Sequence, residues 1–576
     1  MSKASDFATT GVWQAADVDV SGKNYYVYEL NNLSTVYRVC DINALVAAPD
    51  SVAAQIISID DDACKPTGWE TAYTNPFGNS GAETKTYTEA IIYEMHIRDW
   101  SKGIDANNIG KFDDITAGLG TNGDGKFGQH LKDLGITHVQ ILPMFDYAET
   151  NSNTDYNWGY NPYQYNVPEG RYTNNHDNGG NEAVKQMRGM IKAFHDAGIA
   201  VNMDVVYNHT NGTSFGSLYD MTVPFYYYRL TGGAYSNGSG CGNETDSSMP
   251  MYKKYMIDSL SHWMRDYHIN GFRFDLMGLH EAETMAEIYT ELAKIDKNVM
   301  VYGEPWTGGD SPVKNSSTKA GKVDNAGYGA FDDDFRNAIK GGEFGGFEKG
   351  QVQGKFEDDK IIAGLTGAAS TRNDTNNAGL SIHYVECHDN YTLFDKLDIS
   401  AMNGTSKDDW IAYNSLSDAS QDAIRAQDKL AAAFVLLAQG TPFMNGGQEF
   451  MRTKHGNENS YNQDAGDNDN AIDMTFKTTY SDVYNVYKGL IALRKSSDAF
   501  TKGQNVEAEK VQNGVTKYIT KGTTDEYCIF FNATASAVNI TTTGYSTVID
   551  VTDGSLQESN TLPTSVAAKN FVVLKK

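Results

Sequence analysis

INGFRFDLMG, at residues 269–278, is the stretch of sequence that decides the fold. Apolar and polar residues alternate along it, so Arg273 and Asp275 point to the same side of a strand while the two phenylalanines face the other side. One helical pattern precedes it near 252–267, and another follows it at 281–295. A strand placed between two helices is typical of a parallel sheet covered by helices.

The same succession of strand, loop and helix runs in both directions from this stretch. It begins with EAIIYEMHIRDW (89–100) and ends with a helix near 482–495. About eight strand candidates alternate with helices in this part of the chain, which predicts a closed (β/α)8 TIM barrel. The remaining strand candidates are ITHVQILPMF (136–145), GIAVNMDVVYN (198–208), NVMVYGEPW (298–306), YGAFDDDF (328–335), SIHYVECHDN (381–390) and GTPFMNGGQEF (440–450).

Segments with period-two patterning flank the predicted barrel. GVWQAADVDV (11–20), NYYVYEL (24–30) and STVYRVC (34–40) indicate strands of a partial β-sandwich, and we expect its leading strands to be missing upstream. Beyond the last helix, strand-like runs and the hairpin signal Asn513-Gly514 indicate an antiparallel β domain. We therefore predict three units: a partial carbohydrate-binding-module-like β segment and linker at 1–87, a catalytic barrel at 88–496 and a C-terminal β-sandwich domain at 497–576.

Composition argues against several classes of protein. The chain has 576 residues, and we find in it no run of the roughly eighteen apolar residues that a membrane-spanning helix needs, so no membrane insertion is expected. A formal net charge of -27 would repel the phosphates of a nucleic acid, which is therefore not expected as a partner. Five scattered cysteines without CxxC spacing indicate neither a disulfide framework nor a zinc site.

Polar side chains follow four of the predicted strands, where the active site of such a barrel lies. Any one of these side chains is more often a cap or an ion-pair partner than a catalytic group. Four polar strand ends in a single barrel nevertheless favour a shared site. The residues concerned are His209, Arg273, Asp275, Glu304, His388 and Asp389.

The residue types at these strand ends predict a glycosidase. A guanidinium beside Asp275 would lower the pKa of that carboxyl and keep it ionised, as a nucleophile requires. An apolar neighbourhood would raise the pKa of Glu304, so that it can give a proton to a leaving oxygen. Two carboxyls about 5 Å apart are typical of retaining glycosidases. His209, His388 and Asp389 would then bind sugar hydroxyls around the reacting ring.

These stretches resemble the four ordered sequence regions of the α-amylase superfamily, glycoside hydrolase family 13. The matching regions are DVVYNH (204–209), GFRFDLMG (271–278), YGEPW (302–306) and YVECHDN (384–390). The resemblance implies Asp275 as nucleophile, Glu304 as general acid/base and Asp389 as transition-state stabiliser. It also implies that His209, Arg273 and His388 form the sugar-binding subsite at the cleaved bond.

A further run, DYNWGYNPYQYNVPEGRY (155–172), resembles the YNWGYDP signature of the type I pullulanases. This resemblance implies debranching, the cleavage of α-1,6-glucosidic branch linkages in pullulan, starch or glycogen-derived α-glucans. It further implies that Tyr160 stacks on the sugar at the cleaved bond and that Trp306 lines the branch side. Asn161 stands where the signature has Asp and lacks its charge, while Trp158 is interpreted as a core residue beneath the loop.

Alternatives to this interpretation stay open. An α-1,4-acting amylase, an isoamylase-like debrancher or a transglycosylase of the same superfamily would share the four regions, because loop shape decides the linkage. From another class, a non-catalytic α-glucan-binding protein on a barrel scaffold is the rival. The intact set of Asp275, Glu304 and Asp389 disfavours it.

Cofactor, metal and location are the least constrained by the sequence. No cofactor is expected to be required, and a structural calcium ion is kept as an option without assigned ligands. We expect a secreted or cell-surface location for the native full-length protein, with the cytoplasm as the alternative, and the sequence does not predict the oligomeric state. The residues weighed for calcium are Asn208, Asp332, Asp333, Asp334, Asp464, Asp467 and Asp469.

Overall fold

The computed structural model describes most of the chain. The described residues are 2–3, 5, 13–15, 18–32, 35–70, 73–78, 85–148, 156–175, 179–317, 326–342, 347–367, 378–401, 404, 409–462 and 469–576. The run 464–467, which holds two of the acidic residues weighed for calcium, Asp464 and Asp467, lies outside them. Among the described residues, no helix is both long enough and apolar enough to span a membrane.

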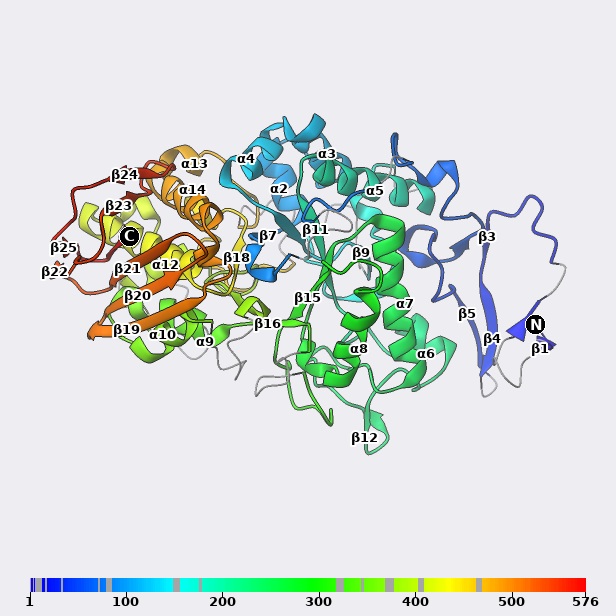
Figure 1. Cartoon of the computed structure of the whole chain (residues 1–576). Helices are drawn as coiled ribbons and strands as arrows, with labels where there is room; N and C mark the ends of the chain where they lie inside the picture. The colour runs from blue at the N-terminus through cyan, green and yellow to red at the C-terminus, as the bar shows by residue number, and fades with distance from the viewer. Residues whose placement is uncertain are drawn as a thin grey trace.

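Eight parallel strands close into a barrel at the centre of the molecule (Figure 1). Each strand pairs in parallel with its neighbour, and the last strand pairs with the first, which leaves no free edge. This arrangement confirms the predicted (β/α)8 barrel. The strands are β7 (Ile92–Met95), β8 (His138–Ile141), β11 (Ala200–Val205), β14 (Gly271–Phe274), β15 (Met300–Gly303), β16 (Gly329–Phe331), β17 (Ser381–His383) and β18 (Thr441–Asn445).

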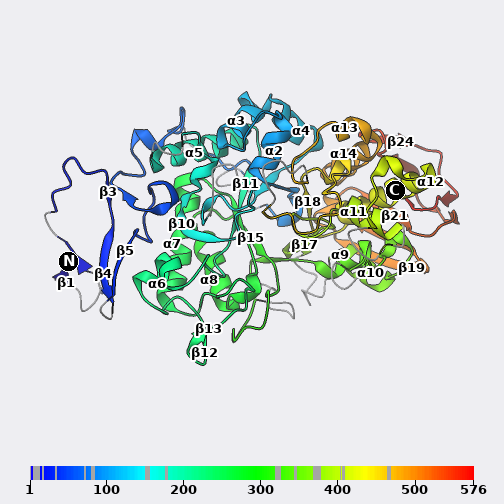
Figure 2. The ribbon, with the colours of Figure 1, turned by 180° about the vertical axis from the view of Figure 1, so that it is seen from behind.

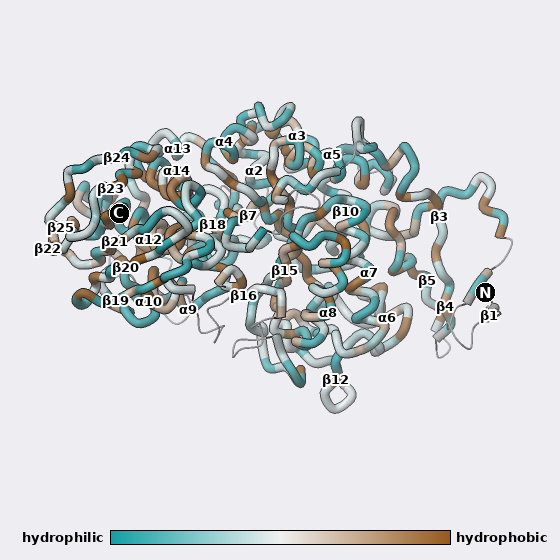
Figure 3. The backbone as a smooth tube through the Cα atoms, in the orientation of Figure 1, coloured by the Kyte–Doolittle hydropathy of each residue, from teal (hydrophilic) through white to brown (hydrophobic). Residues whose placement is uncertain are grey.

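Helices alternate with these strands along the chain (Figure 2). In Figure 3, hydrophobic and hydrophilic residues alternate along their tubes, as expected of helices with one buried face. They are α2 (Ile97–Ile104), α3 (Phe112–Leu119), α4 (Lys126–Leu134), α5 (Gly180–Asp196), α6 (Leu218–Thr222), α7 (Pro250–Tyr267), α8 (Ala282–Leu292), α9 (Asp333–Lys340), α10 (Asp358–Leu365), α11 (Leu393–Ala401), α12 (Asp418–Leu437), α13 (Phe476–Thr479) and α14 (Ser481–Ser496).

The strand predicted over 89–100 is shorter than expected. It ends at Met95, and α2 begins two residues later. Ile97 and Trp100 are both buried, and their spacing of three residues places them on one helical face. The apolar run therefore contains the end of a strand and the first turn of a helix, two structures that apolar content alone does not separate.

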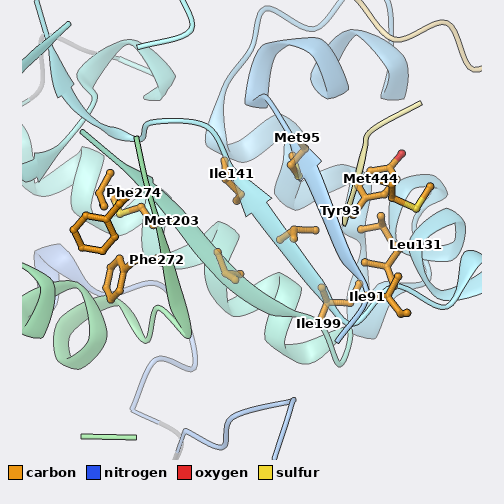
Figure 4. Close-up of a cluster of buried hydrophobic side chains, with 14 of the residues drawn as sticks. Ile91, Tyr93, Met95, Leu131, Ile141, Ile199, Met203, Phe272, Phe274 and Met444 are labelled. Carbon is orange, nitrogen blue, oxygen red and sulfur yellow. The ribbon is translucent and has the colours of Figure 1, made fainter. Parts of the chain in front are cut away.

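Alternation along the barrel strands separates the outer core from the barrel interior. Apolar side chains on one face of the strands pack between strands and helices, as Tyr93, Met203 and Phe272 do in Figure 4. The side chains at alternate positions face the interior, so Glu94 and Asp204 enter the barrel although both strands are buried. The apolar part of the interior is formed by Ala90, Ile92, Met300, Tyr302, Phe331, Ile382, Tyr384 and Phe443.

The C-terminal segment forms an antiparallel sheet with the order β19-β20-β21-β26-β23-β24. Cys528, Phe530 and Leu574 on one face of this sheet pack against Val566 of a two-stranded ladder. The Asn513-Gly514 hairpin forms, with Gly514 at a positive φ of 76°. The strands are β19 (Asn505–Gln512), β20 (Val515–Lys521), β21 (Glu526–Asn532), β22 (Val538–Asn539), β23 (Thr547–Asp550), β24 (Gln557–Ser559), β25 (Ser565–Val566) and β26 (Asn570–Lys575).

The N-terminal segment forms separate two-stranded antiparallel ladders at the opposite end of the molecule from the C-terminal sheet (Figure 1). The strand expected over 11–20 is wrong at 18–20, because Val18 and Val20 lie outside any strand and are exposed, and residues 11–12 and 16–17 lie outside the described residues. The ladder strands are β1 (Ser2–Lys3), β2 (Trp13–Gln14), β3 (Tyr25–Tyr26), β4 (Tyr28–Asn32), β5 (Thr35–Val39) and β6 (Ala54–Gln55). Two further ladders form in barrel loops, β9 (Phe145–Tyr147) with β10 (Pro162–Pro168) and β12 (Leu230–Thr231) with β13 (Ala234–Tyr235).

Candidate active site

Asp275 and Glu304 follow neighbouring strands at matching positions. Phe274 in β14 pairs with Gly303 in β15, and each carboxylate residue is the next residue along its strand. Arg273 contacts both side chains: Nη1 lies 3.2 Å from Asp275 Oδ1, and Nη2 donates to Glu304 Oε1. One planar guanidinium therefore bridges the two carboxyl groups, and the separation of about 5 Å expected of a retaining pair stays a prediction.

Glu304 lies in a buried environment. Its side chain accepts hydrogen bonds from Arg273 and, at 2.8 Å, from the backbone N–H of Leu276. Burial raises the pKa of Glu304 to about 7; the Arg273 charge opposes this shift, and the Asp275 and Asp389 charges add to it. A carboxyl group with this pKa holds a proton near neutral pH, so it can act as a general acid.

Asp275 is more exposed and is held by donors. Asn208 Nδ2 donates to Asp275 Oδ2 at 2.8 Å and to the Asp275 backbone oxygen at 2.9 Å. Together with Arg273, these donors fix the orientation of the Asp275 carboxylate, as a nucleophile requires. Asn208, which had been weighed as a calcium position, thus directs its amide nitrogen at the candidate nucleophile.

Asp204 was not predicted from the sequence and lies at the base of this arrangement. Both of its carboxylate oxygens accept from Arg273 Nη1, at 3.0 and 3.2 Å, and Tyr160 Oη donates to Oδ2 at 2.6 Å. Arg273 also lies 5.7 Å from the centre of the Tyr160 ring. Asp204 therefore fixes two of the predicted site residues, the guanidinium and the aromatic ring.

Glu94 also escaped the sequence prediction, and it fixes His388. The buried Glu94 accepts from His388 Nδ1 at 2.8 Å and from the His388 backbone N–H at 2.6 Å. Burial disfavours the charged imidazole, but the Glu94 carboxylate outweighs it and raises the pKa of His388. The imidazole stacks on the Tyr160 ring, with a centroid distance of 5.0 Å and an interplanar angle of 14°.

The other predicted residues lie around this centre. His209 is buried, bonds to the Asn208 and Tyr160 oxygens at 2.7 and 3.0 Å, and has its pKa lowered by burial. Asp389 is exposed, and its charge acts on Glu304. Trp306 is partly buried, and its carbonyl accepts from the Gly278 N–H at 3.1 Å. All eight predicted residues thus belong to loops or strand ends at the same mouth of the barrel.

Two residues of the signature loop, Trp158 and Asn161, contact other parts of the protein and so have structural roles. Trp158 is 6% exposed and packs edge-on against His388 at 4.8 Å, as interpreted from the sequence. Asn161 donates from Nδ2 to the Ala148 carbonyl, so the amide closes a backbone contact of its own loop.

Lys454 is a third residue that the sequence did not single out. It is 1% exposed and donates from Nζ to the His388 carbonyl at 2.9 Å. Strand alternation could have identified Glu94 and Asp204 from the sequence, because both occupy interior-facing positions of buried strands, where a carboxylate needs partners. Lys454 follows the last barrel strand in a loop, and the sequence gives no comparable signal for it.

The acidic runs do not form a recognisable metal site. Asp332, one of the residues weighed for calcium, is 1% exposed and caps α9 by accepting from the Phe335 N–H at 3.1 Å. Asp469 accepts from Asn457 Nδ2 at 3.0 Å. Within the part of the chain that the structure describes, no group of three or more His, Cys, Asp or Glu side chains has the geometry to hold a metal ion. A structural calcium ion therefore stays a prediction without assigned ligands.

Several solved structures that are similar to this chain are pullulanases. A pullulanase from Bacillus acidopullulyticus superposes with a TM-score of 0.83 at 33% sequence identity, covering 96% of this chain and 68% of that chain. The chain belongs to the pullulanase family. A mutant pullulanase from Paenibacillus barengoltzii complexed with maltotetraose is similar at a TM-score of 0.81 and 31% identity, covering 96% of this chain and 85% of that one.

Curated pullulanases are similar in sequence as well. The pullulanase of Bacillus subtilis (strain 168) is 34% identical over 426 residues, which is 72% of this chain and 56% of the relative. Pullulanase A of Streptococcus pneumoniae serotype 4 is 30% identical over 529 residues, covering 79% of this chain and 39% of the relative. The chain thus spans about half the length of the curated pullulanases that it matches. No protein-family model matches the chain.

Proposed function

We propose that this chain is a retaining α-glucan hydrolase that cleaves α-1,6 branch linkages. The observation that carries the proposal is the pair of carboxyl groups bridged by Arg273 on neighbouring strand ends: Asp275, which Asn208 fixes in orientation, and Glu304, which has its pKa raised to about 7. One carboxyl group that can attack the sugar, beside a second that holds a proton, is what double displacement at a sugar carbon requires.

The first step transfers the sugar to the protein. Asp275 Oδ2 or Oδ1 attacks the anomeric carbon, the bond from that carbon to the glycosidic oxygen breaks, and Glu304 gives its proton to the departing oxygen. A covalent glycosyl ester on Asp275 results. Glu304, now ionised, then takes a proton from water as the water oxygen attacks the anomeric carbon, and the ester bond to Asp275 breaks. The released sugar keeps the α configuration.

The surrounding residues stabilise the positive charge that develops on the sugar ring. Asp389 is exposed and free of the interior network, so it can contact sugar hydroxyls when substrate enters. His388 is fixed by Glu94 through Nδ1, so it can bind a hydroxyl in one orientation, whereas both ring nitrogens of His209 contact protein oxygens and His209 supports Tyr160 instead. Tyr160 is held in place through Asp204 and presents a ring on which a sugar can stack.

The choice of the α-1,6 linkage rests on family membership and on the signature loop. The Paenibacillus barengoltzii and Anoxybacillus pullulanases have been solved with maltotetraose, which supports an α-glucan as the substrate class. Trp306 follows Glu304 by two residues, and we propose that it contacts the branch that departs. A secreted or cell-surface location stays a prediction, as does the absence of a required cofactor.

Product analysis tests the proposal directly. The purified chain is incubated with pullulan and, separately, with linear amylose, with Glu304→Gln as the control, and the products and their initial anomer are identified. Maltotriose released from pullulan as the α anomer, with amylose intact and the variant inactive, is the expected result. Cleavage of amylose instead would keep the mechanism and remove the linkage assignment. Absence of cleavage in both would favour a non-catalytic α-glucan-binding protein.

A further inference from the structure

The loop at 237–244 is fastened to the segment that carries His209. It lies in the connection between β11 and α7. Thr210, directly after His209, donates from its backbone N–H to Asn243 Oδ1 at 3.0 Å, and Asn243 Nδ2 donates back to the Thr210 carbonyl at 2.8 Å. Asn243 is 1% exposed, so this double contact is shielded from water.

The same loop is fastened on its other side to the connection that follows Glu304. The Gly309 N–H donates to the Gly238 carbonyl at 2.7 Å. A Cβ added to Gly308 would stand 2.2 Å from the Ser239 carbonyl oxygen, so the two backbones approach more closely than a side chain would allow. Trp306 lies two residues before this contact. The loop therefore joins the His209 side of the site to the Trp306 side.

Glu244 is the side chain at the centre of this connection. It is 0% exposed, and its Oε2 accepts from the Gly238 N–H at 2.6 Å while its Oε1 accepts from Ser311 Oγ at 2.9 Å. The buried Arg229 lies 3.5 Å from Oε1 and compensates the charge. Each oxygen of one carboxylate thus takes a donor from a different loop, which fixes the distance between the two loops.

We propose that Glu244 is a positioning residue that sets the width of the substrate cleft between His209 and Trp306, and with it the acceptance of a branched glucan. This inference rests on the proposed function and goes further, because it assigns branch selection to a residue that contacts no substrate. A displacement of about 1 Å on one side of a binding site changes affinity strongly, because contacts on both sides must form together. Glu244 holds the segment after Trp306 through Ser311, and it holds its own loop through Gly238.

Ser311→Ala is the sharpest test, because it removes the hydrogen bond to Glu244, together with the one that Ser311 Oγ accepts from the Val313 N–H, while Glu244 keeps Arg229 as its charged partner. Ser248→Ala is the matched control, since that hydroxyl lies in the same connection as Glu244 and donates to the partly buried Asp246. Glu244→Gln is the conservative variant: its amide oxygen can accept from the Gly238 N–H, and its amide nitrogen can donate to Ser311 Oγ.

The first readout is the dissociation constant of two sugars, measured by calorimetry in the Glu304→Gln background. One sugar is a tetrasaccharide with a single α-1,6 branch, and the other is linear maltotetraose. We expect Ser311→Ala to raise the dissociation constant of the branched sugar roughly tenfold, a change of the size that a lost hydrogen bond causes. The dissociation constant of the linear sugar should rise less than about twofold. For Glu244→Gln, both dissociation constants should stay within about threefold of those of the Glu304→Gln background. For Ser248→Ala, they should equal those of that background.

The second readout is amide hydrogen exchange of residues 306–311 without sugar. Ser311→Ala should exchange roughly tenfold faster in this segment, because the loop opens more often, and Ser248→Ala should not. Equal weakening of both sugars, or unchanged exchange in Ser311→Ala, would overturn the proposal. If the Glu304→Gln protein without a further substitution binds neither sugar, the proposed function fails. The exchange measurement then still decides whether Glu244 holds the two loops together.

Discussion

Glu94 accepts two hydrogen bonds from His388. Its two carboxylate oxygens accept from the imidazole Nδ1 at 2.8 Å and from the backbone N–H at 2.6 Å, although the two residues are 294 positions apart in the chain. The backbone bond fixes the strand end, and the ring bond fixes which nitrogen faces the substrate. The first barrel strand thereby orients a candidate sugar-binding residue that follows the seventh strand.

Glu94→Gln is therefore expected to reduce activity without unfolding the protein. An amide can accept only one of the two hydrogen bonds and does not stabilise the imidazolium, so kcat/KM on pullulan should fall by roughly 30-fold, which corresponds to about 2 kcal/mol. Steady-state kinetics with thermal unfolding as the control measures this. Lys102→Ala, a change at a partly exposed position of the following helix α2, should leave kcat/KM unchanged.

The acid/base role of Glu304 predicts a limb in the pH profile. Because burial raises the pKa of Glu304 to about 7, the proton needed for leaving-group departure is lost as pH rises through that value, so kcat should decline above about pH 7. Measuring kcat from about pH 5 to about pH 9, an interval around that value, tests this decline. A flat profile up to pH 9 would argue against Glu304 as the acid.

The same shift makes a stability prediction of defined sign. Glu304 has a folded-state pKa above its unfolded value of 4.5, so the favourable contribution of its neutral form is complete below pH 4.5 and is lost as pH rises through about 7. Glu304→Gln removes this penalty. The Tm difference between variant and wild type should therefore be more positive at pH 8 than at pH 4, and a constant difference would contradict the assignment.

Arg273→Lys should be costly despite the conserved charge. The guanidinium reaches Asp204, Asp275 and Glu304 at once, whereas one ammonium cannot span three carboxylates. At least one buried carboxylate would lose its partner, at a cost of about 3 kcal/mol in the free energy of unfolding. Chemical denaturation measures this cost, and kcat should fall at least roughly 100-fold. Arg265→Lys, on the outer helix α7, is the control.

Asn161→Asp restores the acid of the signature and should nevertheless destabilise this chain. Asn161 Nδ2 donates to the Ala148 carbonyl, and an aspartate would direct a second acceptor at that oxygen. We expect a loss of about 1–3 kcal/mol in the free energy of unfolding. Urea titration of the wild type and of Asn161→Asp measures the difference in the free energy of unfolding. A stabilised variant would show that the loop rearranges to pair the acid.

The sequence by itself determined the barrel and where the candidate chemical residues lie along the chain. Strand-helix alternation needs only local patterning, and a polar residue after an apolar strand must emerge at the barrel mouth, so Asp275 and Glu304 were predictable. The predicted strand over 89–100 failed at its end for the same local reason, since an apolar run does not show where a strand gives way to α2.

Only the tertiary structure decided what holds those residues in place. Asp204 bonds to Arg273 and Tyr160, Glu94 bonds to His388, and Glu244 bonds two loops, and each partner lies far away along the chain. A buried carboxylate must find donors, but its sequence neighbours do not reveal which ones, because barrel closure brings distant strands and loops together. The pKa of Glu304 has the same origin, since burial and the charges of Arg273, Asp275 and Asp389 act through space.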